Sequence, residues 1–435
     1  MNPSINILIA GASGYIGKSL IPRLLERFPE AQITALSRSA QVSEDPRVQW
    51  MPCDLFSQKS ITEALPHRLD LAFYLVHSMG PTAQLDQGSF ADYDLILAEN
   101  FSEALKHKQV KQVVYLGGLI PEDKELSLHL QSRLEVEETF ALHKLPTTVF
   151  RAGLILGEGG SSFQILLKLV KRLPIMVCPA WTQTLTTPVD LPTVLSALTD
   201  ASLEKRHIGK TYDLAGCQPL TYLHMMRETA RKLGLKRYFL TVPFFTPTLS
   251  RLWVTLITNT SKGLVYPLIQ SLEHAMVARP SHQFSASWAN QDYFGLLDKA
   301  SMKTFAGRSL FRFRIRRNTV RSVQRITLGP KQDAASVSSS YFSWLERFGA
   351  PFLRVRREGE IIRLSLLKSR IVLIEMKHST ERSTPKRQLF YLTAGSLVAK
   401  DNRGRLEFRT VLNDHFMLIA IHDYKPALPW FVYKY

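Results

Sequence analysis

The chain has 435 residues, and 55 Lys and Arg against 37 Asp and Glu give it a formal net charge of +18. This length predicts two or three domains with an ample core. An apolar content of 45% with 21% charged residues excludes wholesale disorder, a coiled coil and a collagen-like repeat. The charge is uneven, because residues 1–200 carry −4, residues 201–300 carry +6 and residues 301–435 carry +16. An anionic partner, if charge attracts one, is therefore expected at the last third of the chain.

The three cysteines, Cys53, Cys178 and Cys217, are far apart and have neither the spacing of a disulfide framework nor that of a zinc site. We therefore expect a reducing compartment and no bound metal. The apolar run at the N-terminus, Ile5–Ala10, is only as long as a strand, which argues against a secretory signal. These features predict a cytoplasmic protein.

Short apolar strands alternate with helical patterns through the first 152 residues, which predicts a parallel sheet covered by helices on both faces. The apolar runs are typical of buried strands, and the helices show apolar residues at helical spacing. The predicted strands are Ile5–Ala10, Gln32–Leu36, Leu71–Val76, Gln112–Leu116 and Thr147–Arg151, and the later helices are Asp94–Lys106 and Leu126–Leu142.

From about Gly153 the alternation weakens. Helices are expected at Ser162–Arg172, Leu191–Leu203 and Leu220–Leu233, with a short strand at Thr211–Leu214. The stretch Phe239–Thr258 is the most apolar, but Pro243, Pro247 and Arg251 interrupt it. A bundle or surface helix is therefore favoured over a membrane span, which needs about 20 uninterrupted apolar residues.

The small polar segment Lys331–Ser340 predicts a linker. Beyond it the pattern changes to strands separated by turns, which predicts a separate, mainly antiparallel domain over 341–435. Its expected strands are Phe352–Arg356, Ile361–Leu367, Ile371–Lys377, Gln388–Val398, Arg405–Leu412 and His415–His422.

Glycines recur every third residue after the first strand, at Gly11, Gly14 and Gly17. Missing side chains there permit a tight turn and let a pyrophosphate approach the N-terminus of the next helix, where backbone N–H groups and the helix dipole favour an anion. The alternative is a glycine-rich turn without a ligand. The residues expected to bind a nicotinamide dinucleotide are Gly11, Ser13, Gly14, Tyr15, Ile16, Gly17, Ser37, Arg38, Asp54 and Leu55.

The end of the second strand indicates which dinucleotide is preferred. An NAD-binding unit places Asp or Glu there for the ribose hydroxyls, whereas this chain has Ser37 and Arg38, which suit a 2′-phosphate. NADP is therefore favoured over NAD, and a solvated arginine is the alternative for Arg38. Asp54 would contact the adenine or cap a helix.

The sequence resembles the atypical short-chain dehydrogenases/reductases, near the NmrA-like and the extended, epimerase/dehydratase-like enzymes. The resemblance covers residues 1–328 and implies an NAD(P)-binding Rossmann core over 1–152, with a substrate-side part of the same domain over 153–328. It rests on the segments Ala10–Gly17, Tyr74–Met79, Tyr115–Leu119, Ser132–Arg133, Arg151–Gly160 and Val320–Arg325.

The catalytic residues depart from the family pattern. Active members of the family use a serine and a Tyr-x-x-x-Lys pair, but here His129 and Arg133 occupy the matching pair and Gly117-Gly118 stands in place of the serine. A histidine can exchange protons near neutral pH, whereas a permanently charged arginine could hold a ribose but not shuttle a proton. His77, after the fourth strand, is a second acid/base candidate. The alternatives are exposed helix residues for the pair and a hydrogen-bonded strand-end histidine for His77.

The C-terminal part resembles a domain of unknown function that often follows such reductases, of a START-like helix-grip type. The segments Gly404–Arg409, His422–Pro426 and Leu428–Tyr433 carry this resemblance. A long closing helix is expected after the last strand, but none follows, so either the domain lacks it or another element covers the sheet.

A basic run without acidic residues lies between Lys299 and Asp333, with Arg312, Arg314 and Arg316 alternating with apolar residues. A solvated sheet face is the ordinary interpretation, peripheral contact with an anionic membrane is the next, and nucleic acid is not expected.

The main hypothesis for the whole chain is an NADP-dependent oxidoreductase that transfers hydride on an unidentified apolar or lipid-like small molecule. The alternative is a non-catalytic NADP(H)-binding sensor or assembly protein.

Overall fold

The structure is a computed structural model, and its described residues fall into two compact units. The first unit comprises Met1–Pro81 and Asp94–Arg308, and the second comprises Thr82–Tyr93 and Ser309–Tyr435. The described residues are 5–77, 86–87, 89–106, 108–122, 125–242, 254–255, 257–258, 262–285, 291–300, 318–326, 333–348, 353–366, 372–384, 387–394, 403–411 and 416–424.

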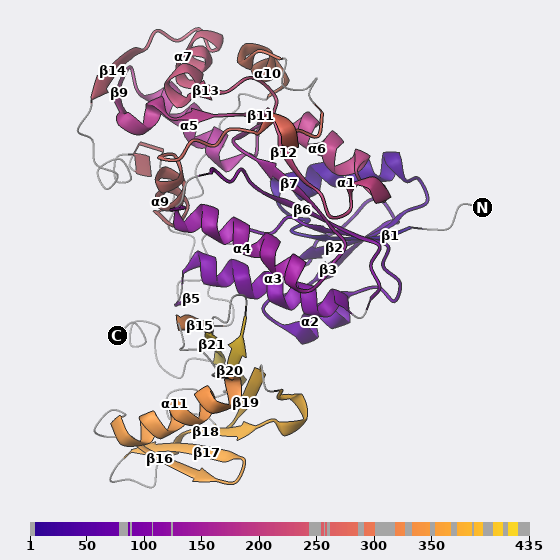
Figure 1. Ribbon diagram of the computed structural model, residues 1–435, viewed down its shortest axis with the longest axis vertical. Helices are drawn as coiled ribbons and strands as arrows, with labels where there is room; N and C mark the ends of the chain where they lie inside the picture. Colours follow the sequence, from indigo (N-terminus) through magenta and orange to yellow (C-terminus); the bar gives the residue numbers. More distant parts are fainter. Residues whose placement is uncertain are drawn as a thin grey trace. The chain divides into compact units, whose positions relative to one another are not determined.

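A seven-stranded parallel sheet forms the centre of the first unit, in the order β12-β7-β6-β4-β1-β2-β3 (Figure 1). The strand order reverses between β1 and β4, and open parallel sheets bind their ligands beyond the carboxyl ends of the strands at such a point. The strands are β1 (Asn6–Ala10), β2 (Gln32–Ser37), β3 (Val48–Pro52), β4 (Leu71–Tyr74), β6 (Gln112–Gly118), β7 (Thr147–Ala152) and β12 (Thr211–Leu214).

Helices cover both faces of this sheet, as the sequence predicts. On one face, α1 (Tyr15–Arg27) and α6 (Leu191–Asp200) share a core with β1 and β2. On the other face lie α2 (Gln58–Ala64), α3 (Phe90–Lys106) and α4 (Leu128–Leu142), which run beside the sheet in Figure 1. The predicted α/β fold with a parallel sheet is confirmed.

The rest of the first unit encloses a second apolar core. It is built from α5 (Ser161–Arg172), α7 (Tyr222–Lys232), α9 (Lys262–Ser271) and α10 (Tyr293–Lys299). Residues 153–308 also supply α6 and β12 to the parallel-sheet layer, so this part of the chain completes the first unit. No helix in the described part of the chain is both long and apolar enough to cross a membrane.

The expectation of a helix over 239–258 is wrong at its start. β14 (Tyr238–Val242) is a strand, paired in parallel with β9 (Ile175–Pro179). Its aromatic and β-branched residues favour a strand, and Pro243 follows directly. Residues 243–253 lie outside the described part, and the described residues 254–255 and 257–258 are helical.

The second unit is an eight-stranded sheet in the order β16-β17-β18-β19-β20-β21-β15-β5. Its neighbours are antiparallel except for the pair of β15 and the two-residue β5 (Asp86–Gln87). Helix α11 (Ala334–Phe348) packs on the sheet, where Phe342 meets Phe390 and Phe408. The strands are β15 (Asn318–Ile326), β16 (Leu353–Glu358), β17 (Ile361–Leu366), β18 (Val372–His378), β19 (Arg387–Ala394), β20 (Arg403–Thr410) and β21 (Phe416–Tyr424).

Two boundaries differ from expectation. β15 pairs with β21 along its whole length, so the second unit begins near Ser309 and not at residue 341. The expected linker 331–340 overlaps α11, because Val337, Tyr341 and Leu345 present a helical apolar stripe that packs on the sheet. This helix covers a face of the sheet, which is the second of the two alternatives above, that another element covers the sheet. The basic residues Arg312, Arg314 and Arg316 and the segment 428–433 lie outside the described residues.

Candidate functional site

The glycine loop after β1 is a close-packed cradle at the point where the strand order reverses. Gly11 has a φ of +87°, and a Cβ there would lie 2.8 Å from the carbonyl oxygen of Leu75, the residue after β4. A Cβ on Gly17 would lie 2.5 Å from the carbonyl oxygen of Gly11. The loop therefore has no room for a side chain at positions 11 and 17. It leads into the N-terminus of α1, whose first turn has no acidic residue. These features fit a dinucleotide pyrophosphate.

The other residues expected in the loop fall into two groups. Ser13 and Gly14 are exposed, and the Gly14 amide donates to the Gly11 carbonyl over 3.0 Å. Ile16 is half-buried and packs on the core. Tyr15 packs against the loop after β8 (Ile155–Leu156), because a Cβ on Gly159 would lie 2.2 Å from the ring. This burial raises the pKa of Tyr15.

Arg38 is exposed immediately after β2, while Ser37 is buried and its Oγ accepts from the Ser39 amide over 3.3 Å. Asp54 forms a turn, since its Oδ1 accepts from the Phe56 amide over 3.1 Å. The N-cap of α2 is Ser57, so Asp54 does not cap this helix. The carbonyl of Leu55 is held by Asn100 Nδ2 at 2.8 Å.

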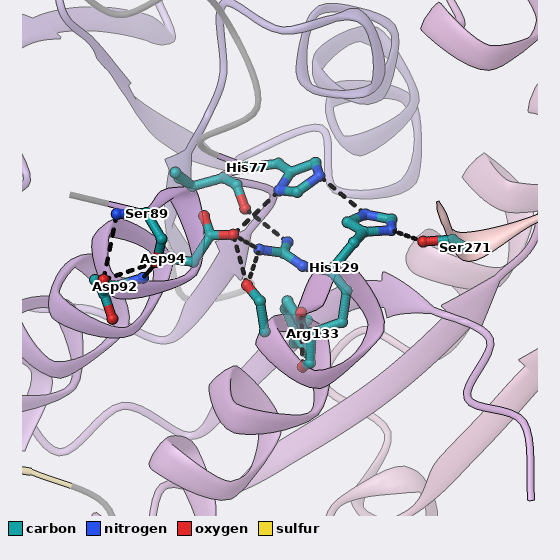
Figure 2. Close-up of polar contacts among 10 residues, drawn as sticks. His77, Ser89, Asp92, Asp94, His129, Arg133 and Ser271 are labelled. Carbon is teal, nitrogen blue, oxygen red and sulfur yellow. Dashed lines mark hydrogen bonds and ion pairs between the residues drawn. The ribbon is translucent and has the colours of Figure 1, made fainter. Parts of the chain in front are cut away.

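The three residues expected to be catalytic lie together (Figure 2). His77 follows β4, and His129 and Arg133 lie one turn apart on α4. The Nε2 atoms of His77 and His129 are 3.2 Å apart. Asp94 on α3 joins the group, because its Oδ2 is 3.3 Å from His77 Nδ1 and also contacts the Arg133 guanidinium. The fold thus brings the three residues that the sequence indicates into one hydrogen-bonded group with Asp94.

Asp94 is the buried centre of this cluster, with 1% of its side chain exposed. Besides Arg133 and His77, its Oδ2 accepts from Ser132 Oγ over 2.8 Å. Burial alone would raise the pKa of Asp94, but the positive charge of Arg133 and the contact with His77 outweigh it, so the pKa lies well below its usual range. Asp94 is therefore a fixed negative charge behind the histidines.

Both histidines favour the neutral form. Burial, and then the neighbouring Arg133, lower the pKa of His77, although 30% of its side chain is exposed. Burial, His77 and Arg133 lower the pKa of His129 further. Asp94 acts in the opposite direction on both residues. The pair is thus neutral near pH 7 and takes up a proton only at a lower pH than an ordinary histidine does.

Arg133 is placed differently from the expectation that it could hold a ribose. Its guanidinium turns inward, contacts Asp94 and lies 3.4 Å from the carbonyl oxygen of Val76, and only 5% of the side chain is exposed. Burial lowers the pKa of Arg133, but Asp94 raises it by more, so the guanidinium stays charged. Arg133 therefore holds Asp94 in place.

An apolar cavity of about 130 Å³ lies beside His129. It begins at the carboxyl ends of β6 and β7 and extends between α5, α7 and α9. Its wall contains no Asp, Glu, Lys or Arg within the part of the chain that the structure describes. The polar side chains among its lining residues are those of His129, Ser162, Trp181, Tyr222 and Ser271, and the apolar ones include Leu130, Ile165, Leu166, Leu169, Met226, Val265, Ile269 and Met276.

Sequence reasoning missed Asp94, Ser132 and Ser271. Asp94 has a signal, because a lone carboxylate within the apolar run Tyr93–Leu97 of a predicted helix indicates a buried charge that needs a partner. Ser271 has no such signal in the sequence, because it lies 142 residues from His129. In the structure its Oγ is 2.9 Å from His129 Nδ1.

Among the described residues, no group of three His, Cys, Asp or Glu could hold a metal ion.

The chain is similar to known proteins over part of its length. The model of the NAD dependent epimerase/dehydratase family matches residues 7–147. The auxiliary protein GraX of Staphylococcus aureus (strain NCTC 8325 / PS 47) is 32% identical over 114 residues, which are 26% of this chain and 36% of that protein. This chain thus aligns with only about a third of the relative's length.

Two solved structures are similar in fold. One is an epimerase from Methanothermobacter thermautotrophicus, with a TM-score of 0.51 and 11% identity over 68% of this chain and 91% of that chain. The other is a nucleoside-diphosphate-sugar epimerase from Staphylococcus aureus, with a TM-score of 0.51 and 14% identity over 67% of this chain and 99% of that chain. At these identities the likeness is one of fold.

Proposed function

We propose that the chain is an NADP(H)-dependent oxidoreductase and that residues 7–147, which match the model of the NAD dependent epimerase/dehydratase family, form its NAD(P)-binding Rossmann core. Its reaction interconverts a carbonyl and an alcohol on an apolar or lipid-like small molecule. The observation that carries the proposal is that His129, hydrogen bonded to His77, lines a cavity at the carboxyl end of the parallel sheet.

The glycine loop would hold the pyrophosphate, and Arg38 would face the 2′-phosphate. A nicotinamide, when bound, supplies or accepts the hydride. The chain's own contribution is the proton that accompanies it. His129 exchanges this proton at the cavity wall, His77 lies behind it, and Asp94 orients His77 and stabilises its protonated form.

The lining of the cavity supports an apolar substrate. Leucine, isoleucine, methionine and tryptophan side chains dominate it, and the described wall holds no charge that would pair with a diphosphate. A sugar nucleotide would leave its charged groups against hydrocarbon, which is costly. The cavity therefore favours a carbonyl compound with a hydrocarbon body, whose oxygen lies near His129.

The test is NADPH oxidation by the purified full chain with a panel of apolar aldehydes and ketones. His129→Phe is expected to retain NADPH binding and lose turnover by about 10²–10⁴-fold, the usual contribution of a general acid/base. Tight NADPH binding without turnover across the panel contradicts the proposal and supports the non-catalytic sensor. Turnover that survives both His129→Phe and Arg133→Ala removes these residues from the mechanism.

Contact with an anionic membrane belongs to the proposal as well. It is supported by the net charge of +16 over residues 301–435, in a protein that we expect in the cytoplasm. Sedimentation with anionic liposomes should show binding at low salt that is lost at high salt, because added ions screen the attraction. The absence of binding at low salt contradicts this contact.

A further inference from the structure

We propose that Ser271, at the end of α9, is the hydroxyl that passes protons between a substrate in the apolar cavity and His129, His77 and Asp94. This inference rests on the proposed function and adds the group that touches the substrate. Ser271 comes from outside the parallel-sheet layer, and the catalytic serine, tyrosine and lysine of the resembled family lie elsewhere in the sequence.

Ser271 occupies the position that such a role needs. It lines the cavity together with His129, and its Oγ is 2.9 Å from His129 Nδ1. Only 1% of Ser271 is exposed to solvent, so bulk water is held away from it. Figure 2 shows the hydroxyl facing His129, whose other ring nitrogen faces His77. The four side chains Asp94, His77, His129 and Ser271 thus form a continuous hydrogen-bonded chain.

The carboxylate at one end sets the direction of these hydrogen bonds. The Asp94 carboxylate only accepts, so His77 donates from Nδ1. A neutral His77 then accepts at Nε2, which makes His129 the donor from its own Nε2 and the acceptor at Nδ1. Ser271 donates to that Nδ1. This assignment of protons follows from the network and satisfies the three contacts among Asp94, His77, His129 and Ser271.

One added proton reverses the direction beyond His77. Protonated His77 donates from both nitrogens, His129 donates from Nδ1, and the hydroxyl of Ser271 is released to donate into the cavity. In the reduction, a carbonyl carbon gains the hydride and the electron pair of its π bond moves to oxygen. That oxygen takes the Ser271 proton, Ser271 takes the Nδ1 proton of His129, and His129 takes the Nε2 proton of His77. Alcohol oxidation runs through the same steps in reverse.

Ser271 also has a second acceptor within reach. Its Oγ lies 3.0 Å from the carbonyl oxygen of Pro267, the ordinary bond of a helical serine to the residue four positions earlier. Ser127 Oγ lies 3.0 Å away on the other side. A hydroxyl has one proton to donate, so the bond to Pro267 competes with the bond to His129. Ser127 can itself donate to Ser271, so its contact need not compete.

Ser271→Ala tests the relay in the NADPH-loaded full chain. We expect kcat to fall by about 10²-fold, within the usual contribution of a proton-transfer group, while NADPH affinity stays unchanged and the urea midpoint falls no more than in the control Ser202→Ala. Ser271→Thr keeps a hydroxyl and should restore part of the loss. Ser202→Ala is the matched control. Ser202 is also buried and its hydroxyl also donates to the carbonyl four residues earlier, that of Leu198, but Ser202 does not line the cavity.

A second measurement needs no cofactor. The protein has 12 histidines, and labelling them with ¹⁵N allows the ring nitrogens of His129 to be assigned by comparison with His129→Gln. Ser271→Ala should shift the Nδ1 resonance of His129, and Ser202→Ala should leave it in place. An unchanged Nδ1 resonance in Ser271→Ala would overturn the contact on which the relay depends.

The outcomes separate this inference from the proposed function. If the wild type turns over and Ser271→Ala turns over equally fast, the relay is wrong and the oxidoreductase stands. If the wild type shows no turnover with any carbonyl compound, the proposed function fails and the relay fails with it.

Discussion

The Nε2 atoms of His77 and His129 lie 3.2 Å apart, although 52 residues separate them in the sequence. One residue follows β4 and the other lies in the first turn of α4, so the parallel sheet and a covering helix meet at this contact. A single proton can occupy the space between two imidazole nitrogens at this distance. The protonation of one histidine therefore sets the tautomer of the other, and the pair titrates as a unit.

Removal of Arg133 should destabilise the fold strongly. Arg133→Met leaves the buried carboxylate of Asp94 without its permanent countercharge, and we expect a loss of about 3–5 kcal/mol in the free energy of unfolding in urea. Asp94→Asn combined with Arg133→Met should recover part of it. Arg68→Met is the control, because Arg68 is 59% exposed where it pairs with Asp70 and should cost less than about 1 kcal/mol. An unchanged urea midpoint for Arg133→Met would contradict the buried-pair account.

Stability should fall on mild acidification because of the two histidines. Burial and Arg133 lower the pKa of His77 and His129 in the folded state against the opposing effect of Asp94, whereas both titrate near about 6.5 in the unfolded chain. The unfolded state thus binds more protons below about pH 6.5, so the free energy of unfolding decreases as the pH falls from about 7 to 5.

Urea unfolding across that pH range measures the effect. His77→Asn combined with His129→Gln should flatten the dependence, and His67→Gln, which changes an exposed histidine, should not. A dependence of equal slope in the double variant would place its origin elsewhere in the chain.

The parallel sheet could be predicted because its signals are local. Apolar runs such as Leu71–Val76 indicate buried strands, and the glycine loop indicates the turn between the first strand and the first helix. The strand at the start of β14 and the assignment of β15 to the second unit could not be predicted, because pairing with distant strands decides both. Tyr238–Val242 is a strand because β9 lies beside it, and Asn318–Ile326 belongs to the second unit because β21 does.

The residues of the site also divide into those that could be predicted from the sequence and those that could not. His77, His129 and Arg133 could be selected because they occupy positions with a known chemical expectation at strand ends and on one helix. Ser271 could not, because nothing in its local sequence separates it from an ordinary helical serine. Asp94 lies between the two cases, since its charge within an apolar helix face indicates burial but not which residues it meets.

The glycine cradle gives a steric prediction. Gly17→Ala would place a Cβ 2.5 Å from the Gly11 carbonyl oxygen and 2.7 Å from the Ala12 Cα, which are backbone atoms and cannot rotate away. We expect a cost of about 1–3 kcal/mol in stability and a loss of dinucleotide affinity, measured by urea unfolding and by NADPH fluorescence titration. Gly118→Ala is the steric control for stability, because its Cβ would meet only Arg133 Cγ, at 3.6 Å. Equal NADPH affinity in Gly17→Ala and the wild type would exclude the loop as the pyrophosphate site.

Arg38 should decide between the two dinucleotides. Its side chain is exposed directly after β2, where the ribose 2′ position falls in a Rossmann core. A charge-assisted bond to a 2′-phosphate contributes about 1.5–3 kcal/mol, so Arg38→Ala should weaken NADPH binding by about 10–100-fold. NADH, which has no 2′-phosphate, should bind Arg38→Ala and the wild type equally well.

Arg23→Ala is the matched control for Arg38→Ala, since Arg23 is an exposed arginine of α1, where it pairs with Glu26 at the helix surface. It removes the same formal charge from the same unit, so it separates a general electrostatic effect from a local contact. Equal affinities of the wild type for NADPH and NADH would contradict the 2′-phosphate argument, because the contact would then carry no preference. A weakening of NADH binding equal to that of NADPH in Arg38→Ala would assign the arginine to the part of the cofactor that both share.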